Sequence, residues 1–158
     1  MMDDKRQQLI SNVKAAIADK KNETEVLTVA VVLIDAFSEG FDWTGFYMMR
    51  GDILEVGPYV GPETPHTKIE LNSGICGAAA SSKQSVVVDD VNADPRFLAC
   101  SITTRSEIVV PLMDGDTCLG EIDIDSNRPA FFTDDDRIML EEIARIIVRK
   151  LKALPRSD

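Results

Sequence analysis

The chain has 158 residues, of which 44% are hydrophobic and 28% charged, and its formal net charge is −10. These values suit one globular domain with a full hydrophobic core and argue against disorder, collagen or a coiled coil. The 17 basic residues are scattered and form no stripe that could follow a phosphate backbone, so we expect no nucleic-acid partner.

The N-terminal stretch MMDDKRQQLISNVKAAIADKK lacks the apolar centre of a signal peptide. The longest apolar run, VLTVAVVLIDAF, is too short and too interrupted to span a bilayer. We therefore expect a cytoplasmic protein with no membrane partner. Three cysteines are an odd number, which argues against a disulfide framework and leaves room for free or redox-active thiols.

Two helices are expected within residues 3–39. In the first, apolar residues recur at the three- and four-residue spacing of an amphipathic helix: Leu9, Ile10, Val13, Ala16 and Ile17. Asn22 or Thr24 could then cap a new start, and TEVLTVAVVLIDAFSEG predicts a more buried helix that Gly40 stops.

Residues 43–126 carry the pattern of a sheet. WTGFYMMRGDILEVGPYVG alternates apolar and polar residues around positions 50–52, and EIVVPLMDGDTCLGEIDID does so around positions 114–116, so each predicts a hairpin. Between them, HTKIEL predicts a weaker strand, NSGICGAAASSKQ a short, closely packed helix, and SVVVDDV a further strand.

The last helix is predicted over residues 133–153, with Thr133 as its N-cap, acids in its first turn and bases in its last. Its apolar side carries Ile138, Leu140, Ile143, Ile146, Ile147 and Leu151. Helices around meandering strands predict an α+β fold, a central antiparallel sheet with the terminal helices on one face. The other face is left for a ligand pocket, and residues 1–158 are expected to form this single domain.

The strand pattern places acids on one face of the predicted sheet. In TCLGEIDID, the period of two puts Glu121, Asp123 and Asp125 opposite Cys118 and the isoleucines. A hairpin could bring Glu107 to them. These carboxylates either form the solvated outer face of a half-buried sheet, or line a pocket where they bind an amine or donate a proton.

The three cysteines lie in different surroundings. Cys118 shares a face with isoleucines, which favours a buried and inert thiol. Cys76, within GICGAA, suits either packing or a helix start, where the helix dipole lowers a thiol pKa. Cys100 has Arg96 and Arg105 nearby, and either cation would favour the thiolate, so Cys100 is the best candidate nucleophile.

His66, the only histidine, has no Cys or His at ligand spacing, so we expect no metal and an exposed loop position. Trp43 and Tyr47 lie four residues apart on a predicted strand and therefore on one face. They either belong to the core or line a pocket.

The motifs WTGFY, GICGAAA, VVVDDV, LAC, SEIVVPL and EIDIDS occur in an order and spacing that resembles the free methionine-(R)-sulfoxide reductases, a branch of the GAF domains. The resemblance runs from about Trp43 to the end of the last helix. It implies a GAF fold with a small pocket on one face and terminal helices that often pair in a homodimer on the other. It also implies reduction of the R epimer of free methionine sulfoxide, without a cofactor, by cysteines that thioredoxin or a similar dithiol recycles.

The resemblance also implies roles for particular residues. Cys100 becomes the attacking cysteine and Cys76 a second redox cysteine. The pocket carboxylates are Glu107, Asp123 and Asp125, and the pocket aromatics are Trp43 and Tyr47. A thiolate attacks sulfoxide sulfur only if the departing oxygen is protonated, so such a site needs an acid near its nucleophile.

The chain departs from the family pattern at three positions. The family's usual resolving cysteine lies ten residues before Cys76, where this chain has His66. An acidic residue often follows the family's attacking cysteine, but this chain has Ser101 at that position. A histidine typically lies three residues before the cysteine, but this chain has Phe97 there. Turnover must then use Cys76 to resolve Cys100, or external thiol. The alternative is a GAF module that keeps the pocket and senses a small ligand without catalysis.

Overall fold

The computed structural model describes residues 2–97 and 103–155. Its centre is a six-stranded sheet in the order β3-β2-β1-β6-β5-β4, with every neighbouring pair antiparallel. The strands are β1 (Trp43–Arg50), β2 (Ile53–Val60), β3 (Lys68–Glu70), β4 (Val86–Val88), β5 (Ser106–Asp114) and β6 (Thr117–Ser126). The predicted α+β fold is confirmed.

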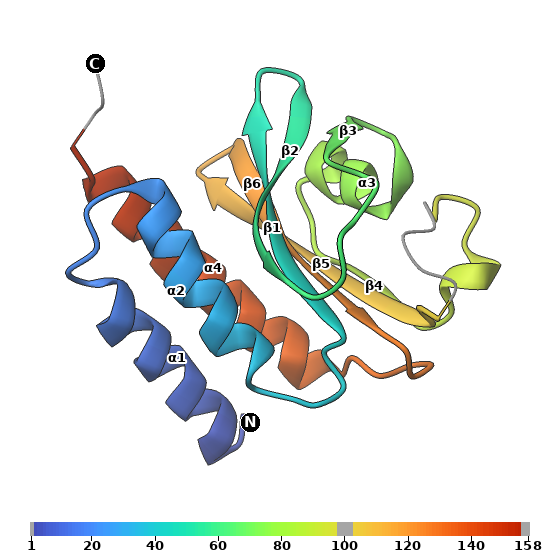
Figure 1. Ribbon diagram of the computed structural model, residues 1–158, viewed down its shortest axis with the longest axis horizontal. Coiled ribbons are helices and arrows are strands. Elements are labelled where there is room, and N and C mark those ends of the chain that lie inside the picture. Colours follow the sequence, from blue (N-terminus) through green and yellow to red (C-terminus); the bar gives the residue numbers. More distant parts are fainter. Residues whose placement is uncertain (1, 98–102, 156–158) are drawn as a thin grey trace.

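Four α-helices accompany the sheet: α1 (Asp4–Ile17), α2 (Glu23–Asp35), α3 (Gly74–Ser82) and α4 (Asp134–Ala153). Helices α1, α2 and α4 lie on one side of the sheet and α3 lies on the other (Figure 1). A short 3-10 helix, η1 (Val91–Ala93), follows β4. None of the helices in the described ranges is long and apolar enough to cross a membrane.

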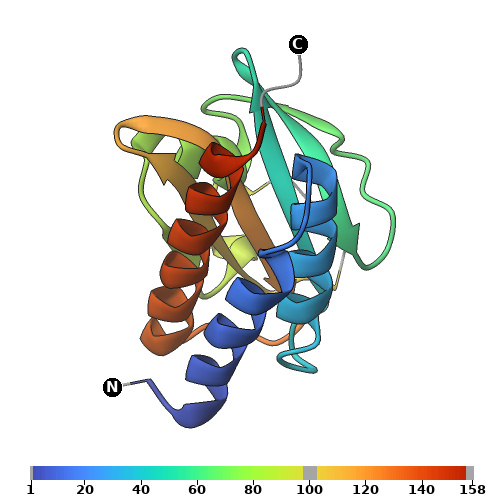
Figure 2. The ribbon, with the colours of Figure 1, turned by 90° about the vertical axis from the view of Figure 1, so that its left-hand side faces the viewer.

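The main hydrophobic core lies between the sheet and the terminal helices. Helices α2 and α4 pack on the sheet, and α1 packs on both of them from outside (Figure 2). The sheet contributes the predicted inward positions, including Ile108, Ile122 and Ile124, which are fully buried. Because these positions alternate with the acids along the strands, the acids must lie on the α3 side.

Helix α2 ends earlier than predicted. It stops at Asp35 rather than near Gly40, because the chain then makes two tight turns, with Phe37 N donating to Ile34 O at 3.0 Å and Phe41 N donating to Ser38 O at 3.1 Å. Gly40 does not end the helix, and its role is to make room for a neighbouring aromatic ring. A Cβ at that position would lie 2.1 Å from the Phe131 ring, so glycine allows the close approach of that ring.

Helix α4 begins with a capping box. Thr133 Oγ1 accepts from Asp136 N at 3.2 Å, and Asp136 Oδ2 accepts from Thr133 N at 2.9 Å. The other oxygen of Asp136 accepts from Arg6 Nη2 at 2.7 Å, which ties α1 to α4. Ile138 was expected on the buried side but is 37% exposed, because the buried stripe passes through its neighbour Met139 instead.

Replacing this buried carboxylate should destabilise the fold. We expect Asp136→Ala to lower the free energy of unfolding by about 2–4 kcal/mol, because it removes half of the capping box and leaves Arg6 without its buried partner. Urea denaturation measures the change. Asp134→Ala, which removes an exposed acid from the same helical turn, is the control and should cost less than about 1 kcal/mol. Equal losses in the two variants would contradict this account.

Candidate active site

The α3 side of the sheet brings the predicted acids together. Glu107 on β5 pairs directly with Asp125 on β6, and Asp123 follows on the same face two residues before Asp125. Across β6, Trp43 of β1 pairs with Asp125, and Gly45 of β1 pairs with Asp123. The alternation read from the sequence therefore describes this face correctly.

These acids are buried, so the interpretation as a solvated outer face is wrong. The exposed fraction is 5% for Glu107, 0% for Glu121, 5% for Asp123 and 6% for Asp125, since α3 covers this part of the sheet. Four carboxylate oxygens have no hydrogen-bond partner in the described part of the chain: Asp123 Oδ1, Asp125 Oδ1 and both oxygens of Glu121. Buried polar atoms usually have partners, so these oxygens suit a cationic or proton-donating ligand.

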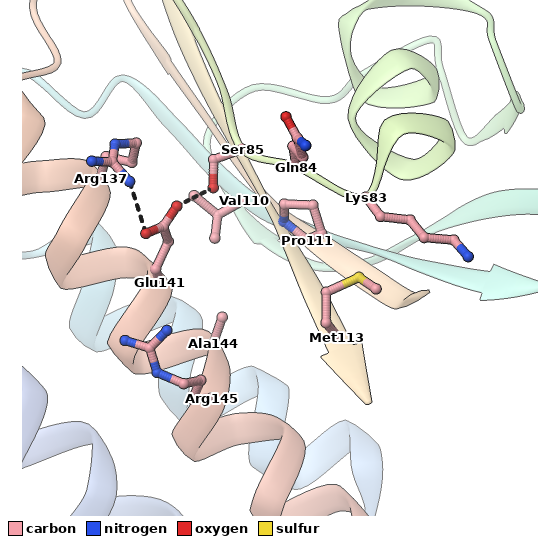
Figure 3. A pocket seen from close by; sticks show the side chains of 10 residues that line it. All are labelled: Lys83, Gln84, Ser85, Val110, Pro111, Met113, Arg137, Glu141, Ala144 and Arg145. Atoms are coloured by element: carbon pink, nitrogen blue, oxygen red, sulfur yellow. Dashed lines mark hydrogen bonds and ion pairs between the residues drawn. The ribbon is translucent and has the colours of Figure 1, made fainter. Parts of the chain in front are cut away.

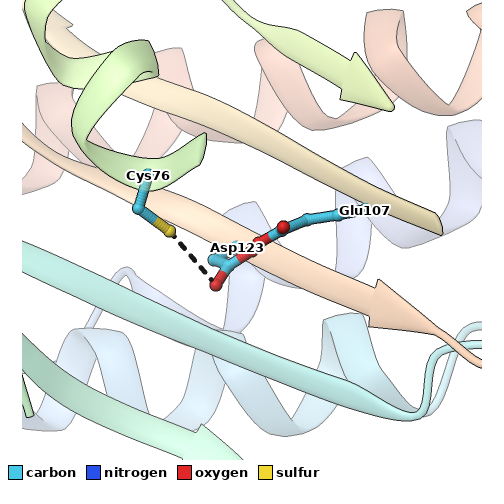
Figure 4. Close-up of side chains that lie close together, drawn as sticks. All are labelled: Cys76, Glu107 and Asp123. Carbon is cyan, nitrogen blue, oxygen red and sulfur yellow. Dashed lines mark hydrogen bonds between the residues drawn. The ribbon is translucent and has the colours of Figure 1, made fainter. Parts of the chain in front are cut away.

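Cys76 points from the first turn of α3 toward the acids (Figure 4). Its Sγ donates to Asp123 Oδ2 at 3.3 Å. The absence of a side chain at Gly77 lets α3 pack closely against the backbone of Glu70, because a Cβ at Gly77 would lie 2.7 Å from Glu70 O. Burial, and then the negative charge of Asp123 and the other acids, raise the pKa of the Cys76 thiol well above its ordinary value. Of the two alternatives left open for Cys76, the one with a pKa lowered by the helix start therefore does not hold.

Glu107, Asp123 and Asp125 act as one titrating group. Burial raises the pKa of Glu107 well above its usual range, and the charges of Asp123 and Asp125, with hydrogen bonds from Glu107 to both, raise it further. Burial also raises the pKa of Asp123 and, more strongly, that of Asp125. Like charges this close cannot all ionise, so the cluster keeps a proton that the three carboxyls share. A buried acid that stays protonated at neutral pH is a competent proton donor.

Glu121 extends the acid cluster beside Cys76. The sequence placed Glu121 on this face but gave it no role. It is fully buried, and burial followed by the charge of Asp123 raises its pKa well above the usual range. Because the folded state favours the protonated carboxyl while the unfolded chain ionises it, the pH-dependent cost of this burial is absent below the unfolded pKa and grows as the pH rises above it.

We therefore expect Glu121→Gln to become more favourable, relative to the natural protein, as the pH rises. The difference in free energy of unfolding should shift toward the variant as the pH rises above roughly 4.3, the ordinary glutamate pKa, and should level off once the pH passes the raised pKa of Glu121. Denaturant titrations at acidic and slightly alkaline pH measure this shift, and the comparison cancels the amide's own packing cost. Glu70→Gln, at an exposed glutamate, is the control. A difference that does not change with pH would contradict the assignment.

Aromatic rings form a wall beside the acids. The Trp43 ring lies between those of Tyr59 and Tyr47, with centroid distances of 5.3 Å and 6.1 Å. Gly45 makes room for it, because a Cβ there would lie 2.4 Å from the Trp43 ring. The indole therefore covers the position of β1 that pairs with Asp123.

Two cavities lie over this face. The larger, about 250 Å³, has Trp43, Thr104 and Asp125 in its walls and suits a small molecule. The smaller, about 20 Å³, is lined by Tyr47, His66, Cys76 and other residues, with Glu107 and Asp123 at its floor. Both aromatics predicted for the pocket therefore line a cavity.

His66 lies in this site, not on an exposed loop as expected. It is half-buried and lines the smaller cavity with Cys76. Its backbone carbonyl accepts from Tyr47 Oη at 2.8 Å, which fixes the segment against β1. No periodic pattern surrounds this position in the sequence, and only the family resemblance marked it.

The predicted nucleophile Cys100 and its neighbour Ser101 lie outside the described residues. Thr103 and Thr104, which follow them in sequence, line the larger cavity. Arg96, one of the cations expected to favour the Cys100 thiolate, has its guanidinium paired with Asp94 at 2.6 Å. The role of Cys100 stays a prediction.

Cys118 was expected to be buried and to face away from the pocket side, and both expectations are wrong. Leu112 pairs with Gly120 but Met113 pairs with Cys118, so Leu119 is an extra residue in β6. This bulge reverses the alternation on its far side. Cys118 is half-buried and packs in the same hydrophobic cluster as Cys76.

A separate groove of about 530 Å³ lies between α4 and β5 (Figure 3). Glu141 crosses it, accepting from Ser85 Oγ at 2.7 Å and from Arg137 Nη1 at 2.9 Å. None of the predicted site residues lines this groove.

The fold and its pocket define the class of protein. Residues 24–151 match the family described as GAF domain, and the chain belongs to that family. Solved GAF structures with lower sequence identity share the fold, such as the GAF domain of an Acinetobacter phosphoenolpyruvate-protein phosphotransferase at 15% identity and a TM-score of 0.83.

Within this class, the chain belongs to the family of proteins named free methionine-R-sulfoxide reductase, to which it is similar in sequence and structure. It is 39% identical over 110 residues to that protein of Saccharomyces cerevisiae, covering 67% of this chain and 61% of the yeast protein. It is 32% identical over 117 residues to that of Escherichia coli, covering 74% and 68%. The structure of the Neisseria meningitidis enzyme in complex with its substrate gives a TM-score of 0.90 at 32% identity, covering 97% of this chain and 93% of that one.

Proposed function

We propose that the protein reduces free L-methionine (R)-sulfoxide to methionine. The observation that carries this proposal is the buried cluster of Glu107, Asp123 and Asp125, which lies next to the Cys76 thiol and which reaches a cavity of small-molecule size through Asp125. A cluster that retains a proton can protonate the sulfoxide oxygen as sulfur is attacked. Membership of the reductase family supports the same assignment.

The free amino group of the substrate has a defined place in this proposal. The unpartnered Oδ1 atoms of Asp123 and Asp125 accept hydrogen bonds from the substrate ammonium. A methionine sulfoxide within a peptide lacks this ammonium, so it leaves the two buried oxygens without partners, which is costly. The pocket therefore selects the free amino acid.

The reaction is a two-electron exchange between sulfur atoms. The Cys100 thiolate attacks the sulfoxide sulfur while Glu107 protonates the oxygen, the oxygen passes to Cys100 as a sulfenic acid, and methionine leaves. Cys76 then gives its proton to Asp123 and attacks the sulfenic sulfur, which releases water and forms a Cys76–Cys100 disulfide. A thioredoxin-class dithiol reduces this disulfide by thiol exchange.

The proposal also includes the domain organisation, cellular location and oligomeric state of the enzyme. Residues 1–158 act as one GAF domain in the cytoplasm, where dithiol reductants are available. The terminal helices pair in a homodimer, and Val32 of α2, which is 54% exposed, provides apolar surface on that layer. No cofactor takes part in the reaction.

Trp43 supplies the apolar surface for the substrate's S-methyl group. We expect Trp43→Ala to lower kcat/KM about 30-fold, equivalent to about 2 kcal/mol, because it removes this surface and opens the pocket to water. Steady-state kinetics measure the change. Trp43→Phe should recover most of it, and full activity in Trp43→Ala would contradict the role.

The test of the proposed function compares two substrates with the same reducible group. Free L-methionine (R)-sulfoxide should be consumed with a kcat/KM at least about 100-fold higher than its N-acetyl derivative, since acetylation removes the ammonium. Chromatographic detection of methionine, with dithiothreitol as reductant, gives both rates. Equal rates, or preference for the N-acetyl substrate, would overturn the proposal.

A further inference from the structure

The floor of the smaller cavity has the donor geometry of a metal site. Cys76 Sγ and one carboxylate oxygen each from Glu107 and Asp123 all lie within 4.8 Å of one another (Figure 4). The Sγ to Oδ2 distance is 3.3 Å. In a tetrahedral zinc site, a sulfur at about 2.3 Å and an oxygen at about 2.0 Å from the ion lie about 3.5 Å apart. The sulfur and this carboxylate oxygen are therefore at about the spacing that such an ion requires.

A second observation points to a positive ligand at this place. Asp123 lines this cavity with a side chain that is more than nine-tenths buried, and its Oδ1 has no partner in residues 2–97 and 103–155. A buried acceptor without a partner lowers the stability of the fold unless a hydrogen-bond donor or a cation binds to it. Glu121 adds a fourth buried carboxyl to the same face. The floor thus has more buried acceptors than the described chain satisfies.

The size and chemistry of the cavity select the kind of ligand. A volume of about 20 Å³ accommodates one ion or one water, and not an amino acid. A thiol sulfur with two carboxylates, and His66 in the cavity wall, is the donor set of zinc-class ions, whereas magnesium and calcium prefer oxygen donors alone.

We infer that Cys76, Glu107 and Asp123 bind a zinc-class divalent cation, and that this ion inhibits the enzyme. The bound ion displaces the thiol proton of Cys76 and the proton that the carboxyls share. It thereby occupies both the resolving thiol and the proton donor. The inhibition rests on the proposed function, while the binding site does not.

Cobalt(II) is the probe for the site, because it takes zinc-type positions and its absorption reports sulfur ligation. The reduced full-length protein should bind about one Co²⁺ per chain with a sulfur-to-cobalt charge-transfer band, and Zn²⁺ should displace it. Cys76→Ser should abolish the band. Asp123→Asn should weaken binding at least about 100-fold, and Cys118→Ser should change neither quantity. Circular dichroism confirms that each variant is folded.

Two results would overturn the inference: no charge-transfer band in the natural protein, or a band that persists in Cys76→Ser. The inhibition is measured separately, with thioredoxin as reductant so that dithiothreitol does not chelate the ion. Zn²⁺ should stop methionine production, and a chelator should restore it. If Co²⁺ binds as described but the protein consumes no sulfoxide, the site stands and the proposed function fails.

Discussion

Glu107→Gln should lower kcat by about 100- to 1,000-fold, the range expected when a general acid is removed. Glu107 is a candidate for holding the proton of the cluster, because burial and the charges of Asp123 and Asp125 raise its pKa well above the usual range. Glutamine keeps the size of the side chain and its contacts but supplies no acidic proton. The loss should therefore appear in kcat more than in KM.

Single-turnover kinetics at saturating substrate isolate this chemical step. In the natural protein, the rate should hold through neutral pH and decline as the pH rises through the raised pKa of the cluster. In Glu107→Gln, this decline should be absent, which a purely structural role for Glu107 would not produce. Glu121→Gln is the matched control, since it changes another buried acid of the same face. An unchanged kcat in Glu107→Gln would show that Glu107 only binds.

Cys76→Ser should separate the first turnover from those that follow. Without a resolving thiol, the sulfenic acid on Cys100 persists, so about one equivalent of methionine per chain should appear in a burst. Continued turnover with thioredoxin should fall at least about 100-fold, because thioredoxin acts on a disulfide that can no longer form. Quenched-flow sampling measures the burst, and dimedone labelling detects the sulfenic acid.

Cys118→Ser is the control for this variant. Cys118 packs in the same hydrophobic cluster as Cys76 but donates to Gly120 O, at 3.2 Å, and not to an acid. Its replacement should leave both the burst and the steady rate unchanged. Undiminished thioredoxin-dependent turnover in Cys76→Ser would show that another thiol, such as Cys118, resolves Cys100.

The features of the site that depend on local sequence patterns could be predicted. The period-two alternation of EIVVPL and EIDID is enough to place Glu107, Asp123 and Asp125 on one face of a hairpin, because side chains of a strand alternate strictly between faces. Whether that face is exposed to solvent or buried depends on α3, which packs on it through small residues. Helix α3 is distant from the acids in the sequence and lies next to them only in the folded structure. The alternation therefore left both interpretations open.

The differences from prediction have local and non-local origins. Cys118 was misplaced because a bulge at Leu119 shifts the register, and the adjacent Gly120, which was the signal for it in the sequence, was not used. The direction of the Cys76 pKa shift stayed open because the acids that raise it belong to strands about thirty or more residues away in the sequence. His66 reaches the pocket through its contact with Tyr47 of β1. The Cys76 and His66 cases depend on packing between distant segments, which a single sequence does not display.

The central claim is that this pocket reduces a free sulfoxide with Cys100 as nucleophile. The most direct measurement follows the loss of the R and S epimers of free L-methionine sulfoxide with dithiothreitol, for the natural protein and for Cys100→Ser. We expect the natural protein to consume only the R epimer, and Cys100→Ser to consume neither epimer while calorimetry still detects binding of the R epimer. Binding without consumption by the natural protein would instead identify a small-molecule-binding GAF module, and unchanged consumption by Cys100→Ser would exclude Cys100 as the nucleophile.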